Sequence, residues 1–267
     1  MDRLVDGVEL VETIVRVTLA EKLRYPAAAL AYYAFVSFLP LLLLVFVAVG
    51  PVLATDLSRV APQFLTPAVR QLVNQSIRTG TERNGAGVLA VLVVLWSAAN
   101  FVGDVRTVVE RVEGTVESTV RHWLRDAVVV LGCLGTAILA VGATSILFAL
   151  RPTGVFNQFA AFVGLWVVLA VTFLPLYYVP STVVRSPRAA LPGAVVTSLG
   201  WTLVYTGIHF YAVNAGQYAV FGVLSGVVVI FTALYISASA LLVGIVVNVA
   251  VATRRDDVPH VARRHER

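Results

Sequence analysis

The chain has 267 residues, of which 58% are hydrophobic and 13% are charged, against about 25% charged residues in an average soluble domain. Its formal net charge is +5, and the single cysteine, Cys133, excludes a disulfide within the chain. The basic residues bracket apolar segments instead of forming the continuous patch that nucleic-acid binding needs, so we predict one all-α membrane bundle (residues 1–253) and no nucleic-acid partner.

The first expected element is an amphipathic helix over residues 7–24, where apolar residues recur near one face. It would lie along the membrane surface, and an ordinary solvated helix fits the same residues equally well. The first expected span is 27–53, which contains no charged residue. Ser37 and Pro40 interrupt this span, and a proline in a membrane helix frees a carbonyl that must find another partner.

A polar connection and a second span follow. Within residues 55–85, Thr66–Pro67 predicts the start of a short amphipathic helix on the outer surface, acting as a lid or simply packed there. The second span, 87–103, continues as a charged helix to about residue 114. After it, the run Arg-His-Trp-Leu-Arg at 121–125 is typical of an anchor at the membrane interface.

The third and fourth spans are expected at 127–150 and 159–179. In the third, Gly132, Gly135 and Gly142 offer a slim surface for close helix contact. The fourth is broken at Pro175. Both segments have the length that one crossing of a bilayer requires.

The last two spans lie in a run of 65 residues, Ala189 to Thr253, that contains no Asp, Glu, Lys or Arg. Such a run is too long for one crossing, which needs about 20 residues. It must turn at the polar segment 214–217, which gives spans 190–213 and 219–253. Residues 254–267 form a charged cytoplasmic tail, which we expect to be frayed.

The positive-inside rule sets the orientation. With six spans, the N-terminal segment, the second and fourth connections and the C-terminal tail share one side and hold 15 of the 20 Lys and Arg residues. This asymmetry predicts a multi-pass protein of the cell (cytoplasmic) membrane with both termini in the cytoplasm.

Motifs for catalysis are absent from the sequence. The four histidines, at positions 122, 209, 260 and 265, are not spaced for a shared metal, and there is no Gly-x-Ser-x-Gly elbow or phosphate loop. We therefore predict no catalytic residue, no metal and no cofactor. A membrane-bound hydrolase or nuclease is accordingly the least favoured function.

Uncharged polar residues and prolines inside the spans are the candidates for a substrate pathway, because polar groups in hydrocarbon either hydrogen-bond between helices or line a wet cavity. The alternative for these residues is interhelical bonding alone. Three glycines are expected to let helices pack closely: Gly222, Gly226 and Gly244. The pathway candidates are Ser37, Pro40, Ser97, Asn100, Thr172, Pro175, Ser198, His209 and Asn248.

Several segments, taken in order, resemble signatures of the YihY/BrkB family of membrane proteins. They are 28–40 in the first span, 95–100 in the second, 178–180 and 188–194 around the fourth connection, and 221–226, 234–235, Gly244 and Asn248 in the sixth. The resemblance implies six transmembrane helices in the cytoplasmic membrane. Relatives have carried the label ribonuclease BN and are suspected of moving lipids or other envelope precursors.

Two positions depart from the family pattern. Val246 stands where relatives often have Glu, and Ala233 where they often have Trp. A proton-driven mechanism that uses this Glu is therefore not carried over. The leading hypothesis is a transporter or flippase of a lipid-like or amphipathic envelope substrate, with membrane lipids as partners. The alternative is a non-transporting scaffold that recruits envelope or cytoplasmic partners.

Overall fold

The computed structural model describes residues 22–53, 83–114, 120–150, 155–214 and 222–262. This part of the chain contains six helices and no strand, which confirms the predicted all-α class. The helices are α2 (Arg24–Leu53), α5 (Arg83–Glu113), α6 (Val120–Leu150), α7 (Val155–Tyr178), α8 (Pro187–Val213) and α9 (Gly222–Ala262).

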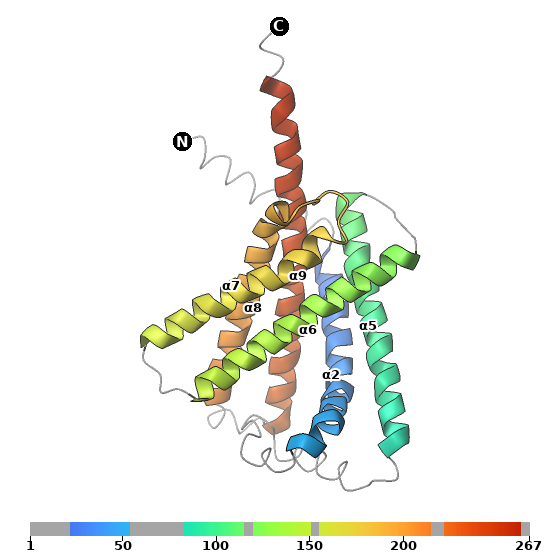
Figure 1. The fold of residues 1–267 in the computed structure, drawn as a ribbon, viewed down its shortest axis with the longest axis vertical. Helices are drawn as coiled ribbons and strands as arrows, with labels where there is room; N and C mark the ends of the chain where they lie inside the picture. The colour runs from blue at the N-terminus through green and yellow to red at the C-terminus, as the bar shows by residue number, and fades with distance from the viewer. Residues whose placement is uncertain (1–21, 54–82, 115–119, 151–154, 215–221, 263–267) are drawn as a thin grey trace.

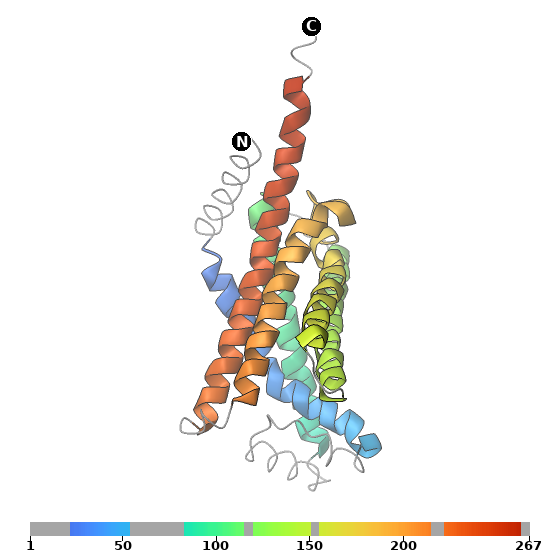
Figure 2. The ribbon, with the colours of Figure 1, turned by 90° about the vertical axis from the view of Figure 1, so that its left-hand side faces the viewer.

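The helices form a bundle built around α9, which contacts α2, α5, α7 and α8. Helices α6 and α7 run side by side and cross obliquely over one face of the bundle (Figure 1). Seen from the side, this pair forms a layer of its own next to α8 and α9 (Figure 2). The end of α5, the start of α6, the end of α7 and the start of α8 therefore meet at one end of the bundle (Figure 1).

Five of the six described helices, α5 to α9, are long and apolar enough to cross a membrane. The sixth, α2, carries no charged residue between Ala27 and Leu53. Large apolar side chains cover the outside of the bundle, as Leu139 (72% exposed) and Phe159 (67% exposed) illustrate. A continuous apolar exterior of this kind fits hydrocarbon and not water, which supports a membrane protein.

Local signals in the sequence set the helix ends beside the turn from α7 to α8. Helix α8 begins with Pro187 in its first turn, and the Ser186 hydroxyl caps it by accepting a hydrogen bond of 3.2 Å from the Ala189 N–H. Helix α5 ends at Glu113, and Gly114 follows with φ of +68°, the left-handed conformation that glycine adopts most readily. Both ends lie at the same end of the bundle.

Some helix bounds differ from the expected spans. Helix α6 begins at Val120, so the interfacial segment 121–125 forms its first turns. Helix α9 continues to Ala262, past the expected end of the span at Thr253, and projects beyond the other helices (Figures 1 and 2). The amphipathic helix expected at 7–24 lies outside the described residues except for its last three, and the surface helix expected after Thr66 lies wholly outside them.

Among the described residues, the α6 glycines do not form the expected close-contact surface. A Cβ atom added at Gly132, Gly135 or Gly142 would meet nothing within 4 Å, because these glycines face outward. Close approach occurs instead between α8 and α9. A Cβ at Gly200 would lie 2.6 Å from the Ala240 Cβ, and one at Gly193 would overlap the Gly244 carbonyl oxygen.

Candidate functional site

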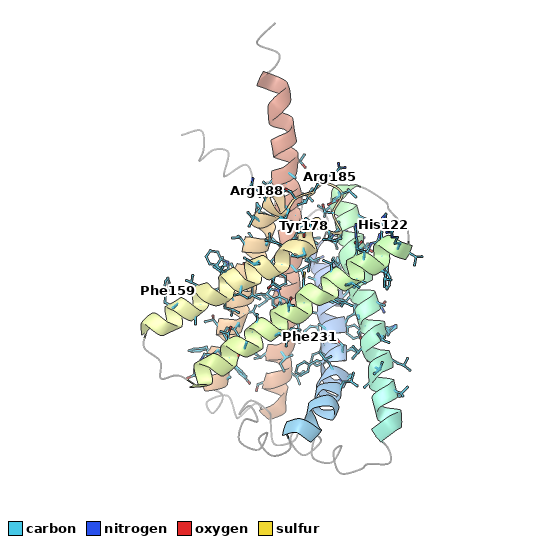
Figure 3. The ribbon with its side chains drawn as sticks, in the orientation of Figure 1. His122, Phe159, Tyr178, Arg185, Arg188 and Phe231 are labelled. Atoms are coloured by element: carbon cyan, nitrogen blue, oxygen red, sulfur yellow. The ribbon has the colours of Figure 1, made fainter. Side chains whose placement is uncertain are left out.

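A polar cavity of about 420 Å³ opens at the end of the bundle where α5 ends, α6 begins and α7 turns toward α8. Figure 3 shows His122, Tyr178 and Arg185 at this end of the molecule. The lining residues come from three helices and one turn: Arg106, Val109, Glu110, His122, Arg125, Asp126, Tyr178, Val179, Pro180, Ser181, Thr182 and Arg185.

Asp126 is the charged residue most deeply buried in the cavity wall, with 4% of its side chain exposed. Its Oδ2 lies 3.5 Å from Nε of Arg106 on α5, and its Oδ1 lies 3.2 Å from Nη2 of the neighbouring Arg125. Arg106 also pairs with Glu110, one helical turn further along α5, at 3.1 Å. These pairs join α5 to α6 at the cavity.

Two arginines bind the backbone of the turn that closes the cavity. Arg125 donates from Nη2 to the Val179 carbonyl at 2.7 Å, and Arg185 donates from Nε to the Thr182 carbonyl at 2.9 Å. Both arginine side chains are exposed to the surroundings. Each therefore keeps guanidinium N–H groups that can reach a ligand.

Glu113, the last residue of α5, fixes the same turn. Its Oε2 accepts hydrogen bonds from the Thr182 backbone N–H at 2.8 Å and from the Thr182 hydroxyl at 2.7 Å. Its Oε1 accepts one from the Ser181 hydroxyl, whose oxygen in turn accepts from the Val184 N–H at 2.7 Å. A carboxylate that accepts several hydrogen bonds is a strong local constraint, so the turn is pinned to α5.

A second polar cluster joins α7, α8 and α9 next to the cavity. The Tyr177 hydroxyl donates to the Leu241 carbonyl at 3.0 Å and contacts the Thr197 hydroxyl, which donates to the Ala240 carbonyl at 3.0 Å. One turn further along α8, the Trp201 indole N–H donates to the Ser237 carbonyl at 3.1 Å. Side chains of α7 and α8 thus hydrogen-bond to carbonyls of α9, as polar side chains do between membrane helices.

Asn248 on α9 belongs to the end of this cluster nearest the cavity. Its Oδ1 accepts a hydrogen bond of 2.7 Å from the Gly193 backbone N–H, whereas its Nδ2 has no partner in the described part of the chain. Asn248 lines a void of about 10 Å³ together with Glu113 and Ser181. A space of this size is at the lower limit for holding one water molecule.

The structure does not gather the predicted pathway residues into one site, and none of them lines the larger cavity. Ser37, Asn100 and Ser198 donate to carbonyls of their own helices. Ser97 is buried, and its hydroxyl has no partner among the described residues. His209 is exposed and stacks on Tyr205. The remaining three pathway candidates are partly buried: Pro40, Thr172 and Pro175.

The three glycines expected to allow close packing differ in how near a neighbouring helix lies. At Gly244, a Cβ would overlap the hydroxyls of Thr197 and Tyr177, so the helices meet there. At Gly226, a Cβ would meet nothing within 4 Å. Gly222 begins α9, and its surroundings lie outside the described residues.

Sequence reasoning missed the cavity itself. In the sequence, the charged residues at the ends of the spans indicated only orientation. The four-residue spacing of Arg106 and Glu110 on one helix accounts for their contact, but no local pattern joins Arg106 to Asp126 or Glu113 to Thr182. Their partners come from the crossing of α5 with α6 and from the turn between α7 and α8. Among the described residues, no three His, Cys, Asp or Glu side chains come together as a metal site would require.

Comparisons with known proteins give the chain a family. The sequence profile of the family described as virulence factor BrkB matches residues 14–267. The ribonuclease-like protein YfkH of Bacillus subtilis (strain 168) is 25% identical over 265 residues, which cover 92% of this chain and 96% of that protein. An uncharacterized protein of Dickeya dadantii (strain 3937) is 23% identical over 142 residues, which cover 47% and 43% of the two chains.

No solved structure gives a significant match to the fold. The family profile nonetheless covers all six described helices, from the start of α2 to the end of α9. It also includes every residue that lines the polar cavity. The chain therefore belongs to the BrkB virulence-factor family of membrane proteins.

Proposed function

We propose that the protein moves or flips a lipid-like, amphipathic molecule across the cell membrane without converting it chemically. The observation that carries this proposal is the charged cavity of about 420 Å³ at one end of a bundle whose exterior is apolar. A polar headgroup fits the first environment and hydrocarbon chains fit the second. Membrane lipids would be both the surroundings and the class of substrate.

The position of the cavity along the membrane-spanning helices supports this proposal. Its wall is built from the last turns of α5, the first turns of α6 and the end of α7, so it lies at the ends of membrane-spanning helices. On α6, Leu124 (59% exposed) and Val128 (66% exposed) present an apolar surface next to the cavity residues Arg125 and Asp126. An amphipathic molecule would meet both surfaces at the level of the lipid headgroups.

Prolines inside the helices next to the cavity also support movement. Helix α7 contains Pro175 and α8 contains Pro192, on either side of the turn that closes the cavity. Each proline removes a backbone donor and weakens the local hydrogen-bond ladder. Both helices nevertheless continue through their prolines, so the predicted break of the fourth span at Pro175 is wrong. What favours movement is the weakened ladder on either side of the turn, and not an unwound segment like those in many secondary transporters.

The proposed orientation places both termini and the cavity on the cytoplasmic side. The four segments that share this side in the six-span topology hold 15 of the 20 Lys and Arg residues, as the positive-inside rule requires. A substrate would then enter from the cytoplasmic leaflet.

A scaffold without transport is the second candidate, and the projection of α9 to Ala262 favours it. The scaffold predicts that shortening α9 after Thr253 abolishes function, whereas charge-removing changes in the cavity are tolerated. Transport predicts the opposite. A nuclease, suggested by the name of the Bacillus relative, is the least supported candidate, and stoichiometric bound metal in the purified protein would revive it.

The test is lipid movement in liposomes that contain the purified full chain. A fluorescent short-chain lipid is placed in one leaflet, and the protein is expected to speed its appearance in the other. Asp126→Asn should slow this movement, and the matched control Asp104→Asn, on α5 but outside the cavity wall, should not. No acceleration for any phospholipid, lysolipid or isoprenoid lipid would contradict the proposal.

A further inference from the structure

The arginines in the cavity wall outnumber the carboxylates, and one arginine is not paired with a carboxylate among the described residues. Three arginines face two carboxylates, and both carboxylates pair with Arg106 or Arg125. Arg185 binds only the Thr182 carbonyl among the described residues, and it does so through Nε. Its two terminal nitrogens therefore remain available in a cavity that carries net positive charge.

A third described carboxylate, Glu113, lies behind the turn and keeps its negative charge, because the Ser181 and Thr182 groups that bind it are neutral donors. It does not line the cavity, and both of its oxygens are already used by these donors. A cationic ligand would thus find its possible partners already bound. An anionic ligand would find the free N–H groups of Arg185 and Arg125 on either side of the turn at 179–182.

We propose that this cavity binds a phosphate-ester group, with Arg185 and Arg125 as its principal donors. Guanidinium groups match phosphate oxygens in planar pairs of hydrogen bonds, which a lysine cannot reproduce. The cavity volume of about 420 Å³ falls in the range of small-molecule sites, about 300–1,000 Å³. It therefore has room for a phosphate together with the glycerol or sugar to which it is esterified.

Two sources could supply this chemistry: the headgroup of an anionic lipid, or a free phosphate ester in the cytoplasm. If the phosphate ester is a lipid headgroup, anionic lipids are the substrate class of the proposed transport, and this part of the inference rests on the proposed function. The binding itself does not rest on it, because a phosphate ester can occupy the cavity whether or not anything crosses the membrane.

The experiment measures binding to the purified full chain with two kinds of probe. The free probes are inorganic phosphate and glycerol 3-phosphate, titrated into detergent-solubilised protein by calorimetry. The lipid probe is phosphatidylglycerol in phosphatidylcholine nanodiscs, with native mass spectrometry counting the anionic lipids that stay bound. Binding of the free probes supports a soluble ester, and retention of phosphatidylglycerol alone supports a lipid headgroup.

Arg185→Gln and Arg125→Gln should each weaken binding about tenfold, as expected for loss of a charge-assisted hydrogen bond. Arg185→Lys should recover only part of the affinity. The matched control is Arg188→Gln, which removes the same charge from the same end of the bundle but outside the cavity (Figure 3). We expect it to bind like the unmodified chain.

Two results would overturn the proposal: no binding of either kind of probe, or an equal loss in Arg188→Gln, which would indicate general surface attraction. Because Arg185 is exposed, its replacement leaves the fold intact, and the thermal midpoint of each variant verifies this. Phosphate binding without lipid movement contradicts only the proposed function. Lipid movement without phosphate binding contradicts only this inference.

Discussion

The Oδ1 atom of Asn248 on α9 accepts a hydrogen bond of 2.7 Å from the backbone N–H of Gly193 on α8. This contact is possible because Gly193 has no side chain, so that the two helices touch through backbone and amide atoms. Asn248 also lines a small void together with Glu113, and Val109 and Ser181 line both this void and the polar cavity. The close contact between α8 and α9 thus adjoins the wall of the candidate site.

Gly193→Ala should strongly destabilise the protein. The new Cβ would overlap the Gly244 carbonyl oxygen and the Asn248 amide, and overpacking of this kind costs about 1–3 kcal/mol. The matched control is Gly207→Ala on the same helix, where a Cβ meets nothing within 4 Å. Thermal unfolding in detergent should show a lower midpoint for the first variant and an equal or higher one for the second. Equal midpoints would show that α8 and α9 are further apart.

Asn248→Leu should also lower stability, because it removes the interhelical acceptor of the buried Gly193 N–H. We expect a loss of about 1 kcal/mol, the usual value of one hydrogen bond between membrane helices. Ser239→Ala is the control, because the hydrogen bond that Ser239 makes in the described part of the chain goes to the Tyr235 carbonyl of its own helix. Unfolding by SDS measures both changes, and a similar small effect in the two variants would contradict the interhelical role of Asn248.

Glu113→Ala should release the turn between α7 and α8. The Thr182 amide loses its acceptor, and the lost bonds to a charged group are worth about 1.5–3 kcal/mol, or roughly a tenfold to hundredfold faster exchange of this amide. Hydrogen–deuterium exchange of residues 179–186 measures the effect. Glu110→Ala removes a carboxylate from the same helix that pairs with Arg106 and not with the turn, so protection should persist there. Unchanged exchange in both variants would rule out the pinning.

The pair between Arg106 and Asp126 should couple α5 to α6. Because only 12% and 4% of the two side chains are exposed, we expect a coupling free energy of roughly 1–2 kcal/mol with little dependence on salt. A double-mutant cycle of Arg106→Gln and Asp126→Asn, followed by SDS unfolding, measures it. Additive effects of the two changes would mean that the pair does not hold these helices together.

Most of the fold is predictable from the sequence because membrane crossing leaves a strong local signal. Apolar length and the absence of charge located the helices, and Gly114 and Ser186–Pro187 have the residue types that end and start them. The continuation of α9 to Ala262 was not predictable on this basis. The charged residues that begin at Arg254 mark the end of the membrane span, but a helix can continue past them into water.

The candidate site was much less predictable than the fold, because it depends on how helices cross. Asn248 was singled out for its amide, but its partner Gly193 lies 55 residues away and contributes only a backbone group. The glycine spacing predicted close helix contacts at the wrong positions for the same reason. Gly193 and Gly244 face a neighbouring helix, whereas Gly132 and Gly226 face open space. Which face of a helix meets another is set by the whole bundle.

The most direct measurement is the sidedness of the cavity end in intact cells. Single cysteines are introduced as Arg121→Cys, Arg188→Cys and Asn214→Cys in a chain with Cys133→Ala, and a membrane-impermeant thiol reagent is added from outside. We expect the first two to react only after the membrane is opened, and Asn214→Cys, at the other end of α8, to react in intact cells. Labelling of positions 121 and 188 from opposite sides would contradict the six-span arrangement and the cavity built on it.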